Sequence, residues 1–193
     1  MKRTSDPGYQ ALRLSLIILA MLSLGALSGV AALQFSGGSG GATTPRWQEI
    51  AWPFPRDGWP AGRAFRCDGG DCAGAELYVR AKLGFCNCDT GVADDDEVDR
   101  VADIDLISAQ FMPDKAGGAV RVAGLSGRSR AYHLTMGDGA RHTAIGFALS
   151  HRCDLLVAVV QGAGEAAGLQ RAALRFLETD ETRHWTMASL QAH

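Results

Sequence analysis

The sequence predicts an α+β domain, an antiparallel sheet of about five strands backed by helices, preceded by one N-terminal transmembrane or signal helix. Three observations predict it. An uncharged run of 20 residues lies near the N-terminus, stretches rich in β-branched and apolar residues follow one another in the C-terminal half, and patterns of helical period flank them. Strands in sequence with helices gathered at the ends are typical of this class.

The uncharged run covers residues 14–33 (LSLIILAMLSLGALSGVAAL). A helix of this length rises ~30 Å, which matches the hydrocarbon core of a bilayer. Basic residues precede the run, which predicts a cytoplasmic N-terminus over residues 1–13 and export of the remainder. The length favours an uncleaved signal anchor, and the small residues at 30–32 leave a cleaved signal peptide as the alternative. Both place the rest of the chain outside the cytoplasm, in the periplasm if the source is a Gram-negative bacterium.

Residues 34–46 are rich in Gly, Ser and Thr, which predicts a flexible linker, and residues 47–193 form the expected extracytoplasmic globular domain. From residue 47 onward there are 15 lysines and arginines against 20 aspartates and glutamates, a balance of −5. This balance argues against nucleic acid as a partner.

The globular domain begins with three tryptophans and three prolines in WQEIAWPFPRDGWPAGR. Because proline removes a backbone donor and restricts its neighbours, the segment is expected to be extended and irregular. We expect Trp47, Trp52 and Trp59 to cover the edge of the core. The alternative is an exposed aromatic surface for a partner or for the membrane interface.

Several elements are expected after this segment. Residues 76–88 alternate, with Leu77, Val79, Ala81, Leu83 and Phe85 on one face, which predicts a half-buried strand. Apolar residues spaced by three and four predict a helix from about Asp95 to Phe111, with the acidic run at its first turn. Further strands are expected at residues 119–125, 130–136, 142–149 and 155–161, and closing helices around residues 169–177 and 185–190. Gly137-Asp138-Gly139 indicates a hairpin, and the apolar residues 155–160 a central strand.

Four of the five cysteines lie within 22 residues, at Cys67, Cys72, Cys86 and Cys88. In an exported domain such a cluster is most often oxidised to structural disulfides. An extended strand would hold Cys86 and Cys88 side by side and too far apart to bond easily. A Cys67–Cys72 bond across the turn would then leave these two free, whereas cross-pairing of the turn with the strand end would use all four; the sequence does not choose among the pairings. Cys153 is then a buried free thiol or the partner of one of the four.

A metal site is the alternative for the same residues. Cys67, Cys72, Cys86 and Cys88 offer soft thiolates for Cu(I) or Zn(II), although their spacing is not that of a zinc ribbon. Thiol redox chemistry is a third interpretation, without a C-x-x-C motif to support it. The consecutive aspartates at 94–96 do not have calcium-loop spacing and are expected to cap a helix.

The remaining polar residues form no recognisable catalytic set. Arg121, Arg128, Arg130 and Arg141 are expected to pair with carboxylates. His133 and His142 are expected to face each other across the hairpin. Neither a Ser–His–acid nor a Cys–His set is evident, which favours a protein that is not an enzyme over a small hydrolase or thiol-redox enzyme.

The order of elements in the C-terminal part of the chain resembles the small α/β/α sandwiches of the PsbP kind, a resemblance that carries no functional residue. The sequence therefore predicts a membrane-anchored extracytoplasmic accessory or assembly protein, attached through its N-terminal helix and binding a membrane or periplasmic protein. A Cu(I)- or Zn(II)-binding protein is the first alternative, and in the preferred interpretation no cofactor is bound.

Overall fold

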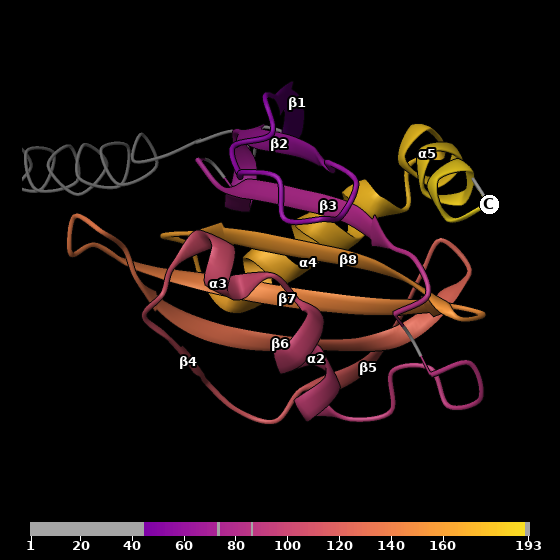
Figure 1. Cartoon of the computed structure of the whole chain (residues 1–193). Helices are drawn as coiled ribbons and strands as arrows, with labels where there is room; N and C mark the ends of the chain where they lie inside the picture. The colour runs from indigo at the N-terminus through magenta and orange to yellow at the C-terminus, as the bar shows by residue number, and fades with distance from the viewer. Residues whose placement is uncertain (1–44, 73, 86, 192–193) are drawn as a thin grey trace, which may run out of the picture. The chain divides into compact units, whose positions relative to one another are not determined.

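Eight strands form one antiparallel sheet in the computed structural model, which describes residues 45–72, 74–85 and 87–191 (Figure 1). The strand order is β1-β2-β3-β8-β7-β6-β4, and β5 pairs with β6 beside β4. The strands are β1 (Arg46–Ile50), β2 (Arg63–Asp68), β3 (Glu76–Lys82), β4 (Phe111–Pro113), β5 (Gly118–Val122), β6 (Leu125–Thr135), β7 (Arg141–His151) and β8 (Asp154–Gly162). The expected antiparallel sheet is confirmed, but it is larger than about five strands.

The additional strands are short and lie toward the two edges of the sheet. β1 and β2 extend it beyond β3, and the three-residue β4 pairs with β6 at the other edge. Their sequences contain too few alternating apolar residues to reveal a strand by pattern alone. Backbone pairing with an existing neighbour makes them strands, so tertiary context decides their conformation.

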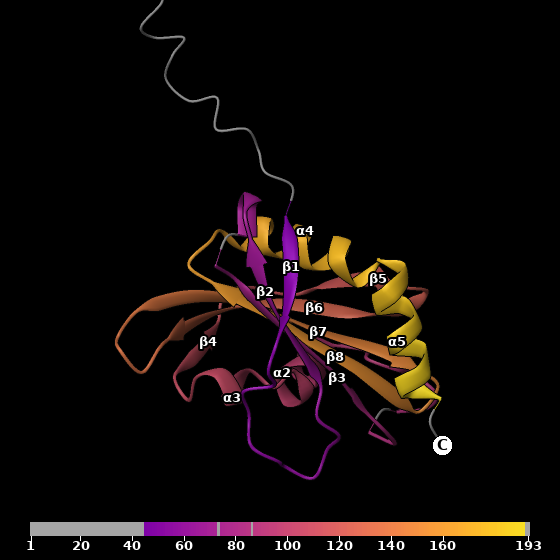
Figure 2. The same ribbon diagram turned by 90° about the horizontal axis from the view of Figure 1, so that it is seen from above.

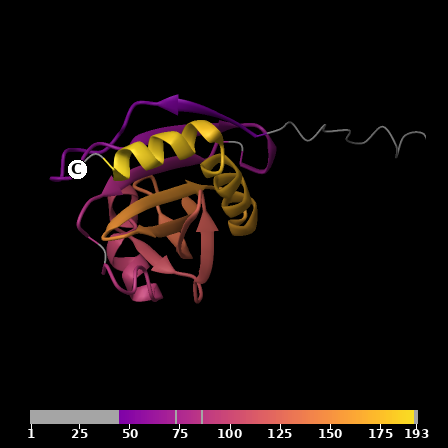
Figure 3. The ribbon, with the colours of Figure 1, turned by 90° about the vertical axis from the view of Figure 1, so that its right-hand side faces the viewer.

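Helices cover both faces of the sheet (Figures 2 and 3). One face carries α2 (Asp95–Val101) and α3 (Ile104–Ile107), and the other carries α4 (Ala166–Leu177) and α5 (Asp180–Leu190). Figure 2 shows the irregular segment between β1 and β2 on the same side as α2 and α3. The two expected C-terminal helices are confirmed as α4 and α5.

Each face has its own hydrophobic core. The larger core joins the inward faces of the central strands to α4 and α5, with fully buried Leu77, Phe147 and Leu169 among its members. The smaller core joins the opposite faces to α2 and α3, through Val98, Val101 and Tyr132. β8 contributes to both cores, as expected for its continuous apolar run.

The hairpin expected around Gly137–Gly139 is confirmed, because β6 and β7 pair from Ser126↔Ser150 to Thr135↔Arg141. The single strand expected over residues 119–125 is divided. β5 ends at Val122, Ala123 and Gly124 turn the chain with positive φ, and β6 starts at Leu125. Ala123 donates its backbone N–H to the carboxylate of Glu178 at the end of α4, which holds the turn in place.

Two expectations about single elements are wrong. The helix expected from Asp95 to Phe111 ends at Val101, because Asp103 takes a left-handed conformation with φ of 48° and a new short helix starts after it. Phe111 lies in β4. β3 is buried on both faces, including Arg80 and Lys82, and it ends at Lys82, so the alternating strand does not extend to the cysteines.

The helix expected over residues 14–33, and residues 34–44 of the expected linker, lie outside the described residues. Within the part of the chain that is described, no helix is both long enough and apolar enough to cross a bilayer.

Candidate functional site

Two disulfides join four of the cysteines. Cys67 bonds to Cys72, five residues away, across the turn from β2 into the short 3-10 helix η1 (Gly70–Cys72). Both side chains are buried in the core beside α4. The turn is tight because Gly69 and Gly70 both have positive φ, which brings the two ends together. Disulfides are thus confirmed, but the expected cross-pairing of this turn with the strand end is wrong.

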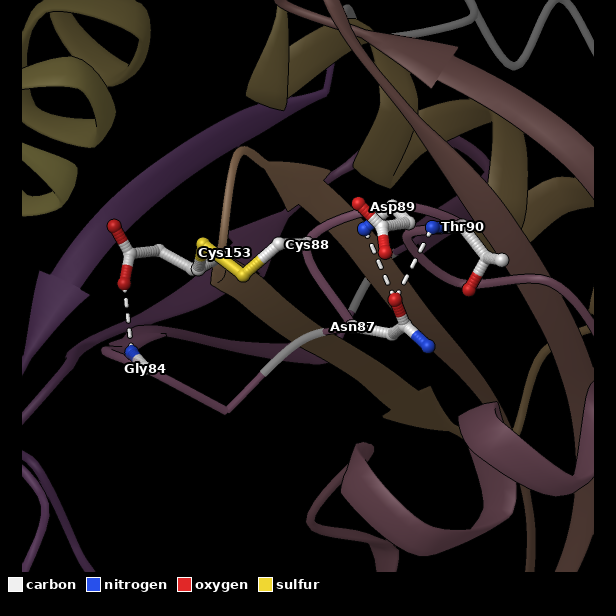
Figure 4. Close-up of a disulfide and its surroundings, with 7 residues drawn as sticks. Gly84, Asn87, Cys88, Asp89, Thr90 and Cys153 are labelled. Carbon is white, nitrogen blue, oxygen red and sulfur yellow. Dashed lines mark hydrogen bonds between the residues drawn. A yellow bond between two sulfur atoms is a disulfide. The ribbon is translucent and has the colours of Figure 1, made fainter.

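The second disulfide joins Cys88 to Cys153, 65 residues away (Figure 4). It ties the segment between β3 and α2 to the turn between β7 and β8. The same region is held by Asn87, whose side-chain oxygen accepts from the backbone N–H groups of Asp89 and Thr90. Asp154 accepts from the N–H of Gly84. The alternative that Cys153 is a partner of the cluster is therefore confirmed.

The two disulfides affect the predicted thiolate metal site. Cys67, Cys72 and Cys88 are oxidised, and Cys86 lies outside the described residues. A disulfide sulfur is not the thiolate that Cu(I) or Zn(II) binds, so the metal site stays a prediction for the reduced chain. Among the described residues, no three or more His, Cys, Asp or Glu side chains gather in a way that could hold a metal ion.

The acidic residues before and within α2 serve the helix and its attachment to the sheet. The Asp94 side chain accepts from the N–H of Glu97, and the Glu97 carboxylate accepts from the N–H of Ala93. Asp94 is the N-cap residue of α2, so the expected capping role is confirmed. Asp95 pairs with Arg128 at 2.7 Å and Asp99 with Arg130 at 2.6 Å.

These contacts confirm the expected carboxylate partners of Arg128 and Arg130. For Arg121 and Arg141, no salt bridge is found within the described residues. Arg141 lines the groove described below.

A buried ionic cluster lies beneath the tryptophan segment. Arg80 donates from Nε to Oδ2 of Asp103 at 2.6 Å and from Nη2 to Oδ1 at 2.7 Å, and it pairs with Asp57 on its other side. Lys82 donates to Asp103 at 2.7 Å and to the carbonyl of Val101 at 2.9 Å. Burial alone would lower the pKa of Arg80, but the hydrogen bonds to Asp103 and Asp57 outweigh it and raise that pKa. The Arg80 guanidinium therefore keeps its charge despite its burial.

Aromatic rings cover this cluster. Trp52 lies over the Arg80 guanidinium, and Trp59 and Phe85 lie near the Lys82 ammonium. A cavity of about 290 Å³ remains between the segment and Arg80. Trp52 and Trp59 are half-buried over this cluster, and Trp47 packs against the larger core as expected. The expected irregular conformation holds for residues 51–62, whereas Trp47 lies in β1 and packs against Phe176.

A surface groove of about 430 Å³ lies beside β4. β4, β6 and the start of β7 form it, and its lining residues are Gln110, Phe111, Met112, His133, Leu134, Thr135, Arg141 and His142. Phe111 and Met112 are 36% and 67% exposed, and they are the large hydrophobic side chains that stand out on the described surface. An exposed apolar pair beside a hollow is typical of a binding site.

A chain of hydrogen bonds runs from this groove into the sheet. His142 Nδ1 lies 2.6 Å from Oε1 of Gln161, and Nε2 of Gln161 donates to Glu76 at 3.2 Å. Glu76 also accepts from the hydroxyl of Tyr78 and from Arg66. Burial acts to raise the pKa of Glu76, but the hydrogen bonds from Tyr78 and Arg66 outweigh it, so its pKa lies below the usual value.

The expected contact between His133 and His142 is wrong. His133 pairs with Thr143 and His142 with Leu134, so the two histidines point to opposite faces of the hairpin. Both still reach the groove, because it wraps around the edge of the sheet. Sequence reasoning missed Gln161 and Glu76. The polar Gln161 at the end of an otherwise apolar strand was the available signal, but its partner on β3 is set by register.

Comparison with known proteins adds little about function. No protein-family model matches the chain, and no curated protein matches it. The crystal structure of a protein of unknown function from Pseudomonas aeruginosa aligns with 70% of this chain and 81% of its own length. The identity is 15% and the TM-score is 0.34, so this likeness carries no argument.

Proposed function

We propose that this chain is a membrane-anchored accessory domain outside the cytoplasm and that it binds a partner protein through the groove beside β4. The observation that carries the proposal is the exposed pair Phe111 and Met112 at the edge of the sheet, beside a hollow of about 430 Å³. Protein interfaces are enriched in such aromatic and methionine side chains.

Two further features support a location outside the cytoplasm. Disulfides persist in oxidising compartments outside the cytoplasm, and this domain has two. The apolar residues 14–33 with basic residues before them favour a membrane anchor. The groove suits a binding protein because no catalytic set accompanies it among the described residues: His142 contacts an amide, and neither disulfide lies in its lining.

Site-specific photo-cross-linking in native membranes tests the proposal. A photoreactive side chain at Met112 should capture one protein, and the same group at Arg175, exposed on α4 on the other face, should not. A Phe111→Asp change should abolish the product at Met112 because it places a charge in the apolar contact. Equal products at both positions, or none at Met112, would refute the groove as the interface.

The anchor and the compartment need a separate measurement. The full-length chain should sediment with membranes and resist extraction by high salt, and protease added to spheroplasts should digest the domain. Intact mass before and after reduction should show two disulfides in protein taken from its own compartment. Protection from protease, or fully alkylated cysteines without reductant, would contradict the proposed location.

A further inference from the structure

His142 is one of the polar groups that line the groove. The residues opposite it are apolar, with Leu134 on β6 and Phe111 opposite Leu134 on β4. Leu134 is 1% exposed and His142 is half-buried, so the ring is partly shielded from water. A hydrogen bond made here would be worth more than one made on the open surface, because water competes for it less. Whether His142 donates or accepts that hydrogen bond depends on its contact with Gln161 and, through it, on Glu76.

Glu76 determines which ring nitrogen of His142 carries the proton. Its carboxylate is ionised and can only accept, so the side chain of Gln161 must turn its NH₂ group toward it. The amide oxygen of Gln161 then faces His142, and an amide oxygen can only accept. Nδ1 of His142 must therefore carry the proton. In the neutral ring this leaves Nε2 with a lone pair.

The side chains of Gln161 and Glu76 are held firmly enough to keep these hydrogen-bond directions. Gln161 is only 5% exposed, so rotation of its amide would leave two buried polar atoms facing like partners. Arg66 donates twice to Oε1 of Glu76, while Tyr78 and Gln161 donate to Oε2. Within the described residues, Nε2 of His142 has no hydrogen-bond partner. The groove thus presents one oriented acceptor beside the apolar side chains of Phe111 and Leu134, with polar side chains, Arg141 among them, elsewhere in its lining.

We propose that the groove binds a tyrosine or tryptophan side chain of the partner protein, whose O–H or N–H donates a hydrogen bond to Nε2 of His142. This inference rests on the proposed function, since both place the partner in the same groove. The aromatic ring would lie against Phe111 and Leu134, which pair across β4 and β6 on the same face as His142. A carbonyl or carboxylate at the same point would meet the lone pair, and a purely apolar group would leave it unpaired.

The tautomer of His142 is the first test, and it needs no partner. Imidazole ¹⁵N shifts, recorded at about pH 8.5 where histidine is ordinarily neutral, should show protonated Nδ1 and unprotonated Nε2 for His142. His133, exposed on the other face of the hairpin, is the internal control. In a Gln161→Met variant the fixed tautomer should be lost, because the acceptor for Nδ1 is gone. Protonated Nε2 in the wild-type ring would overturn the proposal.

Small probes then test the ligand class. We would titrate the isolated full chain with p-cresol and with 4-methylanisole, which has the same ring but no donor, and follow the methyl signals of Leu134, which lies opposite His142. The donor should improve binding about five-fold, the value of one neutral hydrogen bond. His142→Phe should remove this preference while 4-methylanisole still binds. Equal binding of the two probes to the wild-type chain would overturn the proposal.

The two proposals fail in distinguishable ways. If Met112 captures a protein but the probes show no preference for a donor, the groove is an interface of another chemistry and only the inference about tyrosine or tryptophan is lost. If the probes behave as expected but neither Met112 nor its neighbours capture a protein, the proposed partner interaction is lost. A histidine in the expected tautomer would then belong to a small-molecule site.

Discussion

Asp103 has a backbone conformation that an aspartate seldom adopts. Its φ of 48° is left-handed, which costs a residue with a Cβ energy, although Asp and Asn tolerate it better than most. The conformation is held because its carboxylate accepts from both Arg80 and Lys82, two cations buried in β3. The same residue therefore breaks the helix and neutralises the charges beneath it.

An Asp103→Asn change tests this double role. Asparagine keeps the left-handed preference but removes the negative charge, so two buried cations lose most of their compensation. We expect a loss of about 3–5 kcal/mol in the free energy of unfolding, as for other broken buried ion pairs. Urea denaturation measures it. Asp105→Asn, exposed two residues away, is the control and should change stability by less than about 0.5 kcal/mol. Similar values for the two variants would show that the buried cluster does not depend on Asp103.

Gly62 shows a second constraint at the scale of one residue. A Cβ at this position would lie 2.2 Å from the carbonyl oxygen of Val79 and 2.6 Å from the Trp52 ring. The close approach lets the chain leave the tryptophan segment directly against β3. It explains why an irregular segment can cover Arg80 tightly, and why only glycine fits there.

At the scale of elements, α2 is attached to the sheet by charge as much as by apolar packing. Val98 and Val101 lie in the smaller core, while Asp95 and Asp99 bind Arg128, Arg130 and the hydroxyl of Tyr132 on β6. A helix of seven residues cannot be stable alone. These contacts and the Asp94 cap provide the stability that a helix this short lacks by itself.

The attachment of α2 should weaken in acid. Hydrogen bonds from Arg128 and from the N–H of Gly117 lower the pKa of Asp95. A carboxyl whose folded pKa lies below its unfolded value stabilises the fold fully above the unfolded value, about 3.9. Its contribution is lost as the pH falls from there through the folded pKa.

An Asp95→Asn variant should therefore be less stable than the wild type at about pH 6, and the difference should shrink at about pH 3. Urea midpoints at the two pH values measure it. Asp96→Asn, exposed on the same helical turn, serves as the control for general charge effects. A constant gap between the wild type and Asp95→Asn across this range would rule out Asp95 as the group responsible.

At the scale of the whole molecule, the two disulfides are expected to contribute unequally. Cys67–Cys72 closes a loop of five residues and Cys88–Cys153 a loop of 65. In the chain-entropy treatment the short loop is worth about 2 kcal/mol and the long one about 4 kcal/mol. The long bond also joins the segment before α2 to the β7–β8 turn, so its loss should loosen one whole layer.

Paired serine variants measure this difference. Cys88→Ser with Cys153→Ser should lower the free energy of unfolding by about twice as much as Cys67→Ser with Cys72→Ser. Both are compared by urea denaturation without reductant, and keeping each pair together avoids a stray thiol. An equal or reversed order would mean that strain or packing, and not loop length, determines what each bond contributes.

Local pattern was enough to predict the elements of the C-terminal half. The run from Leu155 to Val160 predicted a strand buried on both faces, and Gly137–Gly139 predicted the β6–β7 hairpin; both are confirmed. These predictions worked because each element carries its own periodicity or turn residues. β4 lacked both, and with it Phe111 was assigned to a helix.

The candidate site could not be predicted from the sequence, although its residues are visible there. Glu76, His142 and Gln161 come from three strands, and only the register of β3, β8 and β7 brings them together. The cysteine pairing has the same origin, since Cys153 reaches Cys88 only when β7 and β8 turn beside the segment before α2. Contacts between distant segments depend on how the strands align, and one amino-acid sequence does not reveal that alignment.

The sequence by itself determined the α+β class, the central strand, the hairpin, the closing helices, the capping of α2 and the oxidation of the cysteine cluster, because each follows from neighbours in the chain. The tertiary structure alone decided the helices on both faces, the burial of Arg80 and Lys82, the disulfide partners and the contact between His142 and Gln161. Each of these requires two or more segments to meet, and the free energy of burying their surfaces together selects the partners.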